Sequence, residues 1–178
     1  MKILRIFFYA VLLVLGSAGA SIADTDSLFN GHDTEQPIEI VADNFTIDQD
    51  AKIATFEGRV EATQGNLIFT TETLRVFYET KKGKDEPSIV RLDAAGRFRM
   101  ESPSEVAEGD WAIYDIKSKT ITIAGNVTLR REQSVISGDR LEIDLGTGLS
   151  KFNGAPFDAE TMQIGRVRGR FSLPDETK

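Results

Sequence analysis

The sequence contains no cysteine and only one histidine, His32, among its 178 residues. The absence of cysteine excludes disulfide bonds, thiol catalysis and zinc–cysteine sites. His32 has no nucleophile near it in a polar stretch close to the start, so we expect a solvated tail residue. The chain must be held together by an ordinary apolar core, and its length allows one.

Long hydrophobic runs are also scarce, because the only one stands at the N-terminus. Lys2 and Arg5 introduce ten apolar residues, and small residues then offer cleavage after Ala20 or Ala23. This pattern is typical of a secretory signal peptide, and the run is half of the roughly 20 residues that a spanning helix needs. We predict a signal peptide at residues 1–23, a flexible lead-in at 24–36, one domain at 37–173 and a tail at 174–178. An uncleaved anchor remains the alternative.

Basic residues are few relative to acidic ones. Removal of residues 1–23 would leave 19 basic and 28 acidic side chains, a net charge of −9. Such a body is a poor binder of nucleic acid, which needs clustered Lys and Arg. The sequence also shows no metal-ligand spacing and no phosphate-binding glycine loop. We therefore predict no catalytic residues, no metal, no cofactor and no enzymatic activity, with a carboxylate pair for glycan hydrolysis as a distant alternative.

Alternation of apolar and polar residues dominates the sequence from Pro37 onward. Pairs such as Leu74 and Val76, or Ile121 and Ile123, recur with a period of two, which is typical of half-buried strands. Gly-, Asn- and Asp-containing turn segments separate these runs, and no stretch of ten residues has a helical period. The predicted fold class is all-β.

The predicted strands form an internal repeat. GRVEATQGNLIFTTETLRVF at residues 58–77 resembles GNVTLRREQSVISGDRLEID at residues 125–144. Each unit carries an acid, and a glycine follows it fifteen positions later in three of four cases: Asp43 to Gly58, Asp110 to Gly125, Asp139 to Gly154, but Glu72 to Gly96 at 24 positions. The surplus matches a Lys-rich hairpin tip near residues 81–87. Repeats of this kind are architectural, because stacked units bury a face that one unit cannot.

The apolar positions change parity at each acid. A slip of one residue moves side chains to the other face unless the strand bulges or turns a corner. We infer bulges or corners at Asp43-Asn44, Glu72-Thr73, Asp110-Trp111 and Asp139-Arg140, where Asp commonly bonds to backbone amides. With such bends the sheet rolls over and one face stays apolar, with Ala112 and Tyr114 inside and Trp111 and Ile113 pointing away or lying at the corner.

A rolled sheet with an apolar inner face can be a closed core or can hold an apolar ligand. Acyl chains suit such a lining, since each buried methylene contributes about 0.8 kcal/mol. The two edges of the sheet invite pairing with another strand. The apolar inner face and the open edges of the predicted sheet therefore indicate a role in lipid handling or assembly.

Several motifs resemble the LptA family, the OstA-like periplasmic lipopolysaccharide-transport proteins. Q-P-I at 36–38, F-x-G-x-V-x-x-x-Q-G at 56–65, G-N-V at 125–127 and G-D-x-L at 138–141 lie in family order. The resemblance implies a twisted β-jelly roll of many antiparallel strands. It also implies a non-enzymatic periplasmic carrier that binds the acyl chains of lipid A on the way from the inner to the outer membrane. The implied partners are lipopolysaccharide, an LptC-like inner-membrane subunit, the N-terminal domain of an LptD-like outer-membrane protein and further copies of the chain.

The lipid-binding positions follow from the resemblance and from the register together. The resemblance implies Ile38, Ile40, Phe98, Tyr114 and Ile116, and the register places three of these inside. The full predicted set is Ile38, Ile40, Phe45, Phe56, Val60, Phe69, Leu74, Val76, Phe98, Tyr114, Ile116, Ile123, Val127, Ile136, Leu141 and Ile143. Basic residues that could meet phosphate, or simply lie in solvent, are Lys81, Lys82, Lys84, Arg97 and Arg99.

Two other functions remain open. An LptC-like subunit of the same fold would keep its N-terminal segment as a membrane anchor. A secreted structural β-repeat would assemble through its edges and hold no lipid cargo.

Overall fold

The computed structural model describes residue 29 and residues 32–80, 87–158 and 163–172. Every regular element within these ranges is a β-strand, so the all-β prediction is confirmed. The described residues include no helix with the length and hydropathy to span a membrane. The strands are β1 (Ile38–Val41), β2 (Asn44–Asp48), β3 (Ile53–Gln64), β4 (Leu67–Glu79), β5 (Ser88–Glu101), β6 (Glu105–Asp115), β7 (Thr120–Arg131), β8 (Ser134–Asp144), β9 (Ser150–Asn153), β10 (Phe157–Asp158), β11 (Gln163–Ile164) and β12 (Arg168–Arg170).

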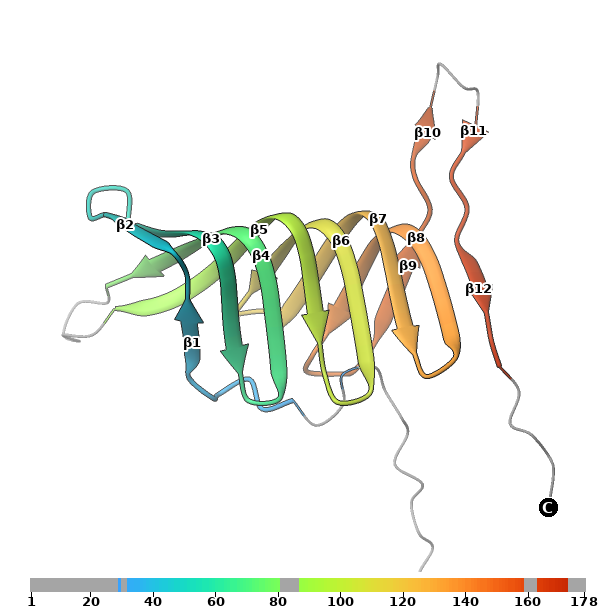
Figure 1. The fold of residues 1–178 in the computed structure, drawn as a ribbon, viewed down its shortest axis with the longest axis horizontal. Helices are drawn as coiled ribbons and strands as arrows, with labels where there is room; N and C mark the ends of the chain where they lie inside the picture. The colour runs from blue at the N-terminus through green and yellow to red at the C-terminus, as the bar shows by residue number, and fades with distance from the viewer. Residues whose placement is uncertain (1–28, 30–31, 81–86, 159–162, 173–178) are drawn as a thin grey trace, which may run out of the picture.

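Ten of these strands form one antiparallel sheet. The long strands β3 to β8 pair in sequence order, each with the next. Both ends are divided, because β1 and β2 share the outer edge of β3, and β9 and β12 share the outer edge of β8. β10 and β11 form a separate hairpin that projects from the body (Figure 1).

The long strands bend over near their middle, at the top of the view in Figure 1, so the sheet folds into two layers. Alternate residues on these strands point between the layers and are buried. In β4, for example, Leu67, Phe69, Leu74 and Val76 are buried, whereas the intervening Ile68 and Arg75 are exposed. This arrangement is the predicted twisted β-jelly roll.

Register shifts mark the bends. Gly58 and Arg59 of β3 oppose the single residue Glu72 of β4, and the same two-against-one count recurs between β5 and β6 and between β7 and β8. The predicted corners are therefore confirmed, but the extra residue lies on the glycine strand and not on the acid strand. The bulge glycines Gly58, Gly96 and Gly125 have φ of 80°, 86° and 77°, which glycine adopts without strain.

In three of the four units the acid packs over the glycine of its own unit. A Cβ at Gly58 would lie 2.6 Å from Asp43 Oδ2, so only glycine fits beneath the carboxylate. The residue after the glycine then reaches the acid, as Arg59 Nε does at 3.1 Å from Asp43 Oδ2. Two further corners repeat this contact, Arg97 with Glu72 and Asn126 with Asp110. At these three corners the prediction that the acid bonds to backbone amides is wrong, because a side chain donates to it.

The fourth unit is incomplete. Gly154 lies against the backbone of Gly165 and not beneath Asp139, because the chain leaves the sheet there and enters the β10–β11 hairpin. The chain returns as β12, which pairs with Val135–Ser137 of β8. The expected last strand in RVRGRF is thus present.

Candidate functional site

The inner face of the jelly roll is one continuous apolar cluster. All six long strands contribute to it, and its most deeply buried members have essentially no solvent exposure: Leu67, Met100, Ile121, Ile123, Leu141 and Ile143. The cluster exists because the period of two is reset at every corner, so the strands keep the same face inward in both layers. No other feature of the described residues gathers so much apolar surface.

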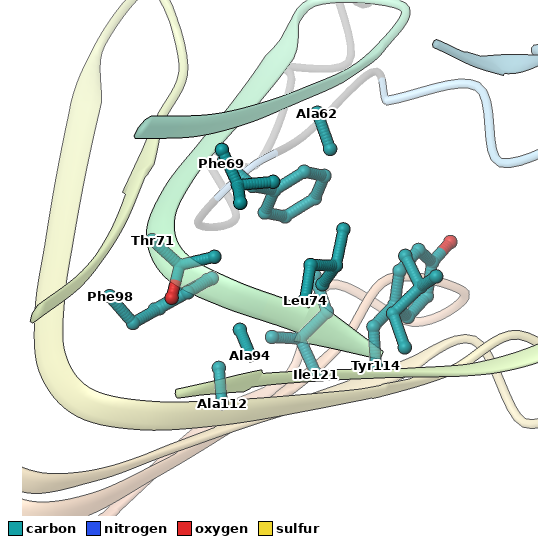
Figure 2. Close-up of a pocket in the computed structure, with 11 residues that line it drawn as sticks. Ala62, Phe69, Thr71, Leu74, Ala94, Phe98, Ala112, Tyr114 and Ile121 are labelled. Carbon is teal, nitrogen blue, oxygen red and sulfur yellow. The ribbon is translucent and has the colours of Figure 1, made fainter. Parts of the chain in front are cut away.

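A small cavity lies between the layers within this cluster. Its volume is about 20 Å³, room for a single water molecule. Figure 2 shows its lining, in which Phe69 stacks on Phe98 at 6.2 Å between ring centroids and faces Tyr114 at 6.3 Å. The interior is therefore packed, and a longer ligand requires the layers to separate.

The described residues include three buried polar side chains, Gln64, Thr71 and Glu105. The Gln64 side chain, 2% exposed, donates through Nε2 to the carbonyls of Thr34 and Gln36 at 3.0 Å each. Its Oε1 therefore accepts, from Tyr114 Oη at 3.2 Å and from His32 Nε2 at 3.1 Å. The amide has a partner at both ends, so its burial is compensated.

The Tyr114 hydroxyl stays neutral at physiological pH. Burial is the main cause that raises the pKa of Tyr114 to about 12, and the hydrogen bond with Gln64 opposes it. The cavity lining is thus largely apolar, and its two hydroxyls are both used in hydrogen bonds: Tyr114 donates to Gln64, and Thr71 donates to the carbonyl of Ala95. The described residues also contain no cluster of three or more side chains that could hold a metal ion.

Most predicted lipid-binding residues lie in this interior. Ten are buried in the cluster, and four more are partly buried against it: Ile38, Ile40, Phe56 and Ile116. The buried ten are Val60, Phe69, Leu74, Val76, Phe98, Tyr114, Ile123, Val127, Leu141 and Ile143. Five of the ten line the cavity itself. Their burial is established, and their role in lipid binding stays a prediction.

Two predicted residues lie outside the cluster. Phe45 is 57% exposed, so the expectation of an interior position is wrong. It lies on β2, the outermost strand, where no layer covers its inner face, and it contacts Phe56 at 4.9 Å between rings. Ile136 is half-buried on β8, where it pairs with Gly169 of β12.

The predicted lipid-binding set left out six residues that line the cavity, although the register had placed Ala112 inside. They are mostly small or lie on β5, which the pattern described least well: Ala62, Thr71, Leu92, Ala94, Ala112 and Ile121. Their parity was a usable signal, because Ala62 follows Val60 and Ala94 follows Leu92 at a spacing of two. Gln64 was visible within the F-x-G-x-V-x-x-x-Q-G motif, but a polar side chain gave no reason to place it inside.

An apolar groove of about 370 Å³ opens at the β2 end of the sheet. Ile47, Ala54, Val76, Tyr78 and Ile89 line it. Ala54 and Val76 also belong to the core cluster, so the groove is continuous with the interior.

The outer face carries ion pairs. Arg99 contacts Glu101 at 2.7 Å and Glu108 at 2.9 Å, and Arg97 contacts Glu72 at 2.7 Å. These two arginines already have carboxylate partners. Lys81, Lys82 and Lys84 lie outside the described residues.

Part of the predicted lead-in is attached to the domain. His32 hydrogen bonds to Gln64 and Asn66, so the prediction of a solvated tail histidine is wrong. Phe29 is 4% exposed and belongs to the core cluster. The predicted signal peptide lies outside the described residues.

Comparisons with known proteins agree with this geometry. The chain is 23% identical over 154 residues to the lipopolysaccharide export system protein LptA of Haemophilus influenzae, covering 84% of each chain. It is 28% identical over 115 residues to the protein of that name from Escherichia coli K12, covering 61% of this chain and 60% of that protein. It also matches the LPS-assembly protein LptD of Thiobacillus denitrificans at 26% identity, covering 66% of this chain and 19% of that protein.

The fold has a counterpart in a solved structure. LptH, described as the LptA homologous periplasmic component of the lipopolysaccharide transport device from Pseudomonas aeruginosa, superposes with a TM-score of 0.65. The alignment covers 80% of this chain and 99% of LptH at 18% identity. The family described as LptA/(LptD N-terminal domain) LPS transport protein matches residues 39–149, more than half of the chain. The protein therefore belongs to the LptA/LptD N-terminal domain family of lipopolysaccharide transport proteins.

Proposed function

We propose that the protein is a non-enzymatic periplasmic carrier of lipopolysaccharide, which binds lipid A acyl chains between the layers of its jelly roll. One observation supports the proposal most strongly. The protein belongs to a transport family, and its sheet presents a single continuous apolar face that lines the interior. Its relatives are named for lipopolysaccharide export and assembly, and none of those names describes an enzyme.

The chemistry of the interior suits acyl chains. Each methylene transferred from water contributes about 0.8 kcal/mol without a specific polar partner. The acidic body gives no general attraction for an anionic head group, so apolar burial must supply most of the affinity. The groove beside Ile47 and Ile89 provides an apolar entrance.

Lipid that copurifies with the protein tests the proposal. The folded protein is purified from a Gram-negative host and its organic extract is analysed by mass spectrometry. Stoichiometric lipopolysaccharide is expected. A matched variant, Leu74→Glu, places a carboxylate beside the cavity and should abolish copurification, whereas Arg75→Glu on the outer face should not. Lipid-free wild-type protein from a host rich in lipopolysaccharide contradicts the proposal and supports a structural β-repeat.

The divided edges of the sheet support end-to-end association with like-folded partners. β1 and β2 leave one row of backbone groups unpaired, and β9 and β12 leave another. Exposed apolar residues accompany both rows: Val41, Phe45 and Ile47 at one end, and Leu149, Val167 and Phe171 at the other. The proposed partners are another copy, an LptC-like subunit and the N-terminal domain of an LptD-like protein.

The charges of the two edges are complementary. Exposed acids Glu39 and Asp48 lie on the β1–β2 edge, and exposed Arg168 and Arg170 form the β12 edge. Opposite edges therefore attract, which favours a head-to-tail joint over a symmetric one. Arg168→Glu with Arg170→Glu should abolish self-association in sedimentation velocity. Mixing that variant with Glu39→Lys/Asp48→Lys should restore heterodimers, and a failure to do so contradicts the joint.

Export with loss of the N-terminal segment is the remaining part of the proposal. The intact mass of the protein recovered from the periplasm distinguishes the carrier from an anchored LptC-like subunit. A mass lacking residues 1–20 or 1–23 supports the carrier. The full-length mass in a membrane fraction supports the anchored subunit.

A further inference from the structure

The residues just before β1 cross the lower side of the jelly roll, opposite the bends of the strands (Figure 1). We name Phe29 and residues 32–36 the N-terminal strap. The strap remains in the chain after either predicted cleavage, because both sites precede it. Its contacts reach both layers of the sheet.

The first set of contacts is with the β3–β4 turn. His32 Nδ1 lies 3.2 Å from Asn66 Oδ1, and Gln64 Nε2 donates to the carbonyls of Thr34 and Gln36. Both carbonyls that accept from Gln64 Nε2 belong to the strap, so the seated strap is what satisfies the N–H groups of this buried amide. Its Oε1 also accepts from His32 Nε2 at 3.1 Å.

The second set of contacts is with the opposite layer. Lys119, in the β6–β7 turn, lies 3.1 Å from Glu35. Tyr114 of β6 donates across the interior to Gln64, the residue that holds the strap. The strap thus ties together the lower rims of both layers, which must part before a ligand longer than the present cavity can enter.

Phe29 connects the strap to the apolar interior. Its side chain is 4% exposed and packs within the core cluster that is the proposed site of acyl chains. The cluster leaves only about 20 Å³ empty, so an acyl chain and the seated strap compete for the same space.

We propose that the N-terminal strap is a built-in plug of the interior: Phe29 fills the acyl site in the empty protein, and acyl binding requires the strap to leave. This inference rests on the proposed function and adds a competition to it. Strap seating and ligand binding exclude each other. The observed association constant is therefore the intrinsic association constant multiplied by the fraction of molecules whose strap is open.

The first test removes the plug. Phe29→Ala in the otherwise intact mature protein should bind purified lipopolysaccharide and a fluorescent long-chain fatty acid more tightly, by about 5- to 150-fold, the usual range for coupled equilibria. Phe29→Leu, which keeps an apolar plug, should stay close to wild type. Equal affinity of wild type and Phe29→Ala overturns the proposal.

The second test fixes the strap and does not depend on the folding of Phe29→Ala. The chain has no cysteine, so Glu35→Cys with Lys119→Cys can be bridged specifically by a short bismaleimide. The bridged protein should lose binding of both probes. The same double variant capped with N-ethylmaleimide keeps the substitutions and lacks the Glu35–Lys119 ion pair, so it should bind at least as tightly as wild type.

The outcomes separate the two proposals. Binding by the capped protein and none by the bridged protein supports the plug. Equal binding by both overturns the plug and leaves the lipid carrier intact. Absence of binding by wild type, the capped protein and Phe29→Ala alike overturns the carrier and the plug together.

Discussion

The two faces of the sheet use the same strands and have opposite chemistry. In β4 the inward residues Phe69 and Leu74 are buried, and the outward residues Arg75 and Phe77 belong to a surface where guanidinium groups of Arg75 and Arg91 lie over the Phe77 ring. The inner face is apolar and continuous through all six long strands, with Gln64, Thr71 and Glu105 as its buried polar residues. The outer face is divided among local ion pairs. The contrast indicates that the buried core and the proposed cargo site share the inner face, while the outer face presents paired charges to solvent.

The largest effect should come from emptying part of the inner face. Leu141 of β8 has 0% exposure, so Leu141→Ala should lower the free energy of unfolding by about 2–5 kcal/mol. Its neighbour Glu142 points outward, and Glu142→Ala should change the free energy of unfolding by no more than about 1 kcal/mol. Urea unfolding measures both. Equal losses of unfolding free energy in the two variants would show that the inner face does not contribute more to stability than the outer face.

The corners keep the apolar side chains on one face of the sheet. Substitution of their glycines should therefore cause the second-largest loss of stability. Gly125 has φ of 77° and packs against the Asp110 side chain, and Gly125→Ala should cost about 1–3 kcal/mol through strain and collision. Gly146, for which no positive φ is found, is the control: alanine there should be tolerated. Thermal unfolding of both variants tests this prediction. A Gly125→Ala variant as stable as wild type would contradict the requirement for glycine at the corner.

The smallest effect should come from the outer ion pairs. The pKa of Glu108 is lowered chiefly by its hydrogen bond from Arg130, with a second from Arg99. Its charged form therefore adds stability above the unfolded pKa of about 4.3, and that stability is lost as the pH falls through the lower folded pKa. The side chain is partly exposed, so Glu108→Gln should cost at most about 1 kcal/mol at pH 7. The difference from wild type should disappear in acid. If Glu108→Gln still lowers the free energy of unfolding in strong acid, the loss comes from packing and not from the charge of Glu108.

Much of the fold followed from the sequence because each strand carries its own local signal. The period of two placed Tyr114 inside and Trp111 outside or at the corner, and the parity slips located the corners. The contact between Gly58 and Asp43 was visible as a spacing but not as packing, because the sequence does not show which strands neighbour each other.

Other features depended on long-range contacts and could not be predicted. Phe45 has an inward register, yet it is exposed because its strand is the last in the sheet. Phe29 and His32 lie in a polar stretch with no period, so only the fold reveals that Phe29 is buried in the core and that His32 is hydrogen-bonded to Gln64. Gly154 repeats the spacing from Asp139, but the chain leaves the sheet at that point.

Photo-crosslinking on the two faces of β4 tests the central claim most directly. Benzoylphenylalanine replaces Phe69, whose ring lies in the interior, or Phe77, whose ring lies outside, so the probe and the strand are the same. Lipopolysaccharide should be captured in cells from position 69 and not from position 77. Folded protein that captures none at position 69, or as much at position 77, would contradict an interior acyl site.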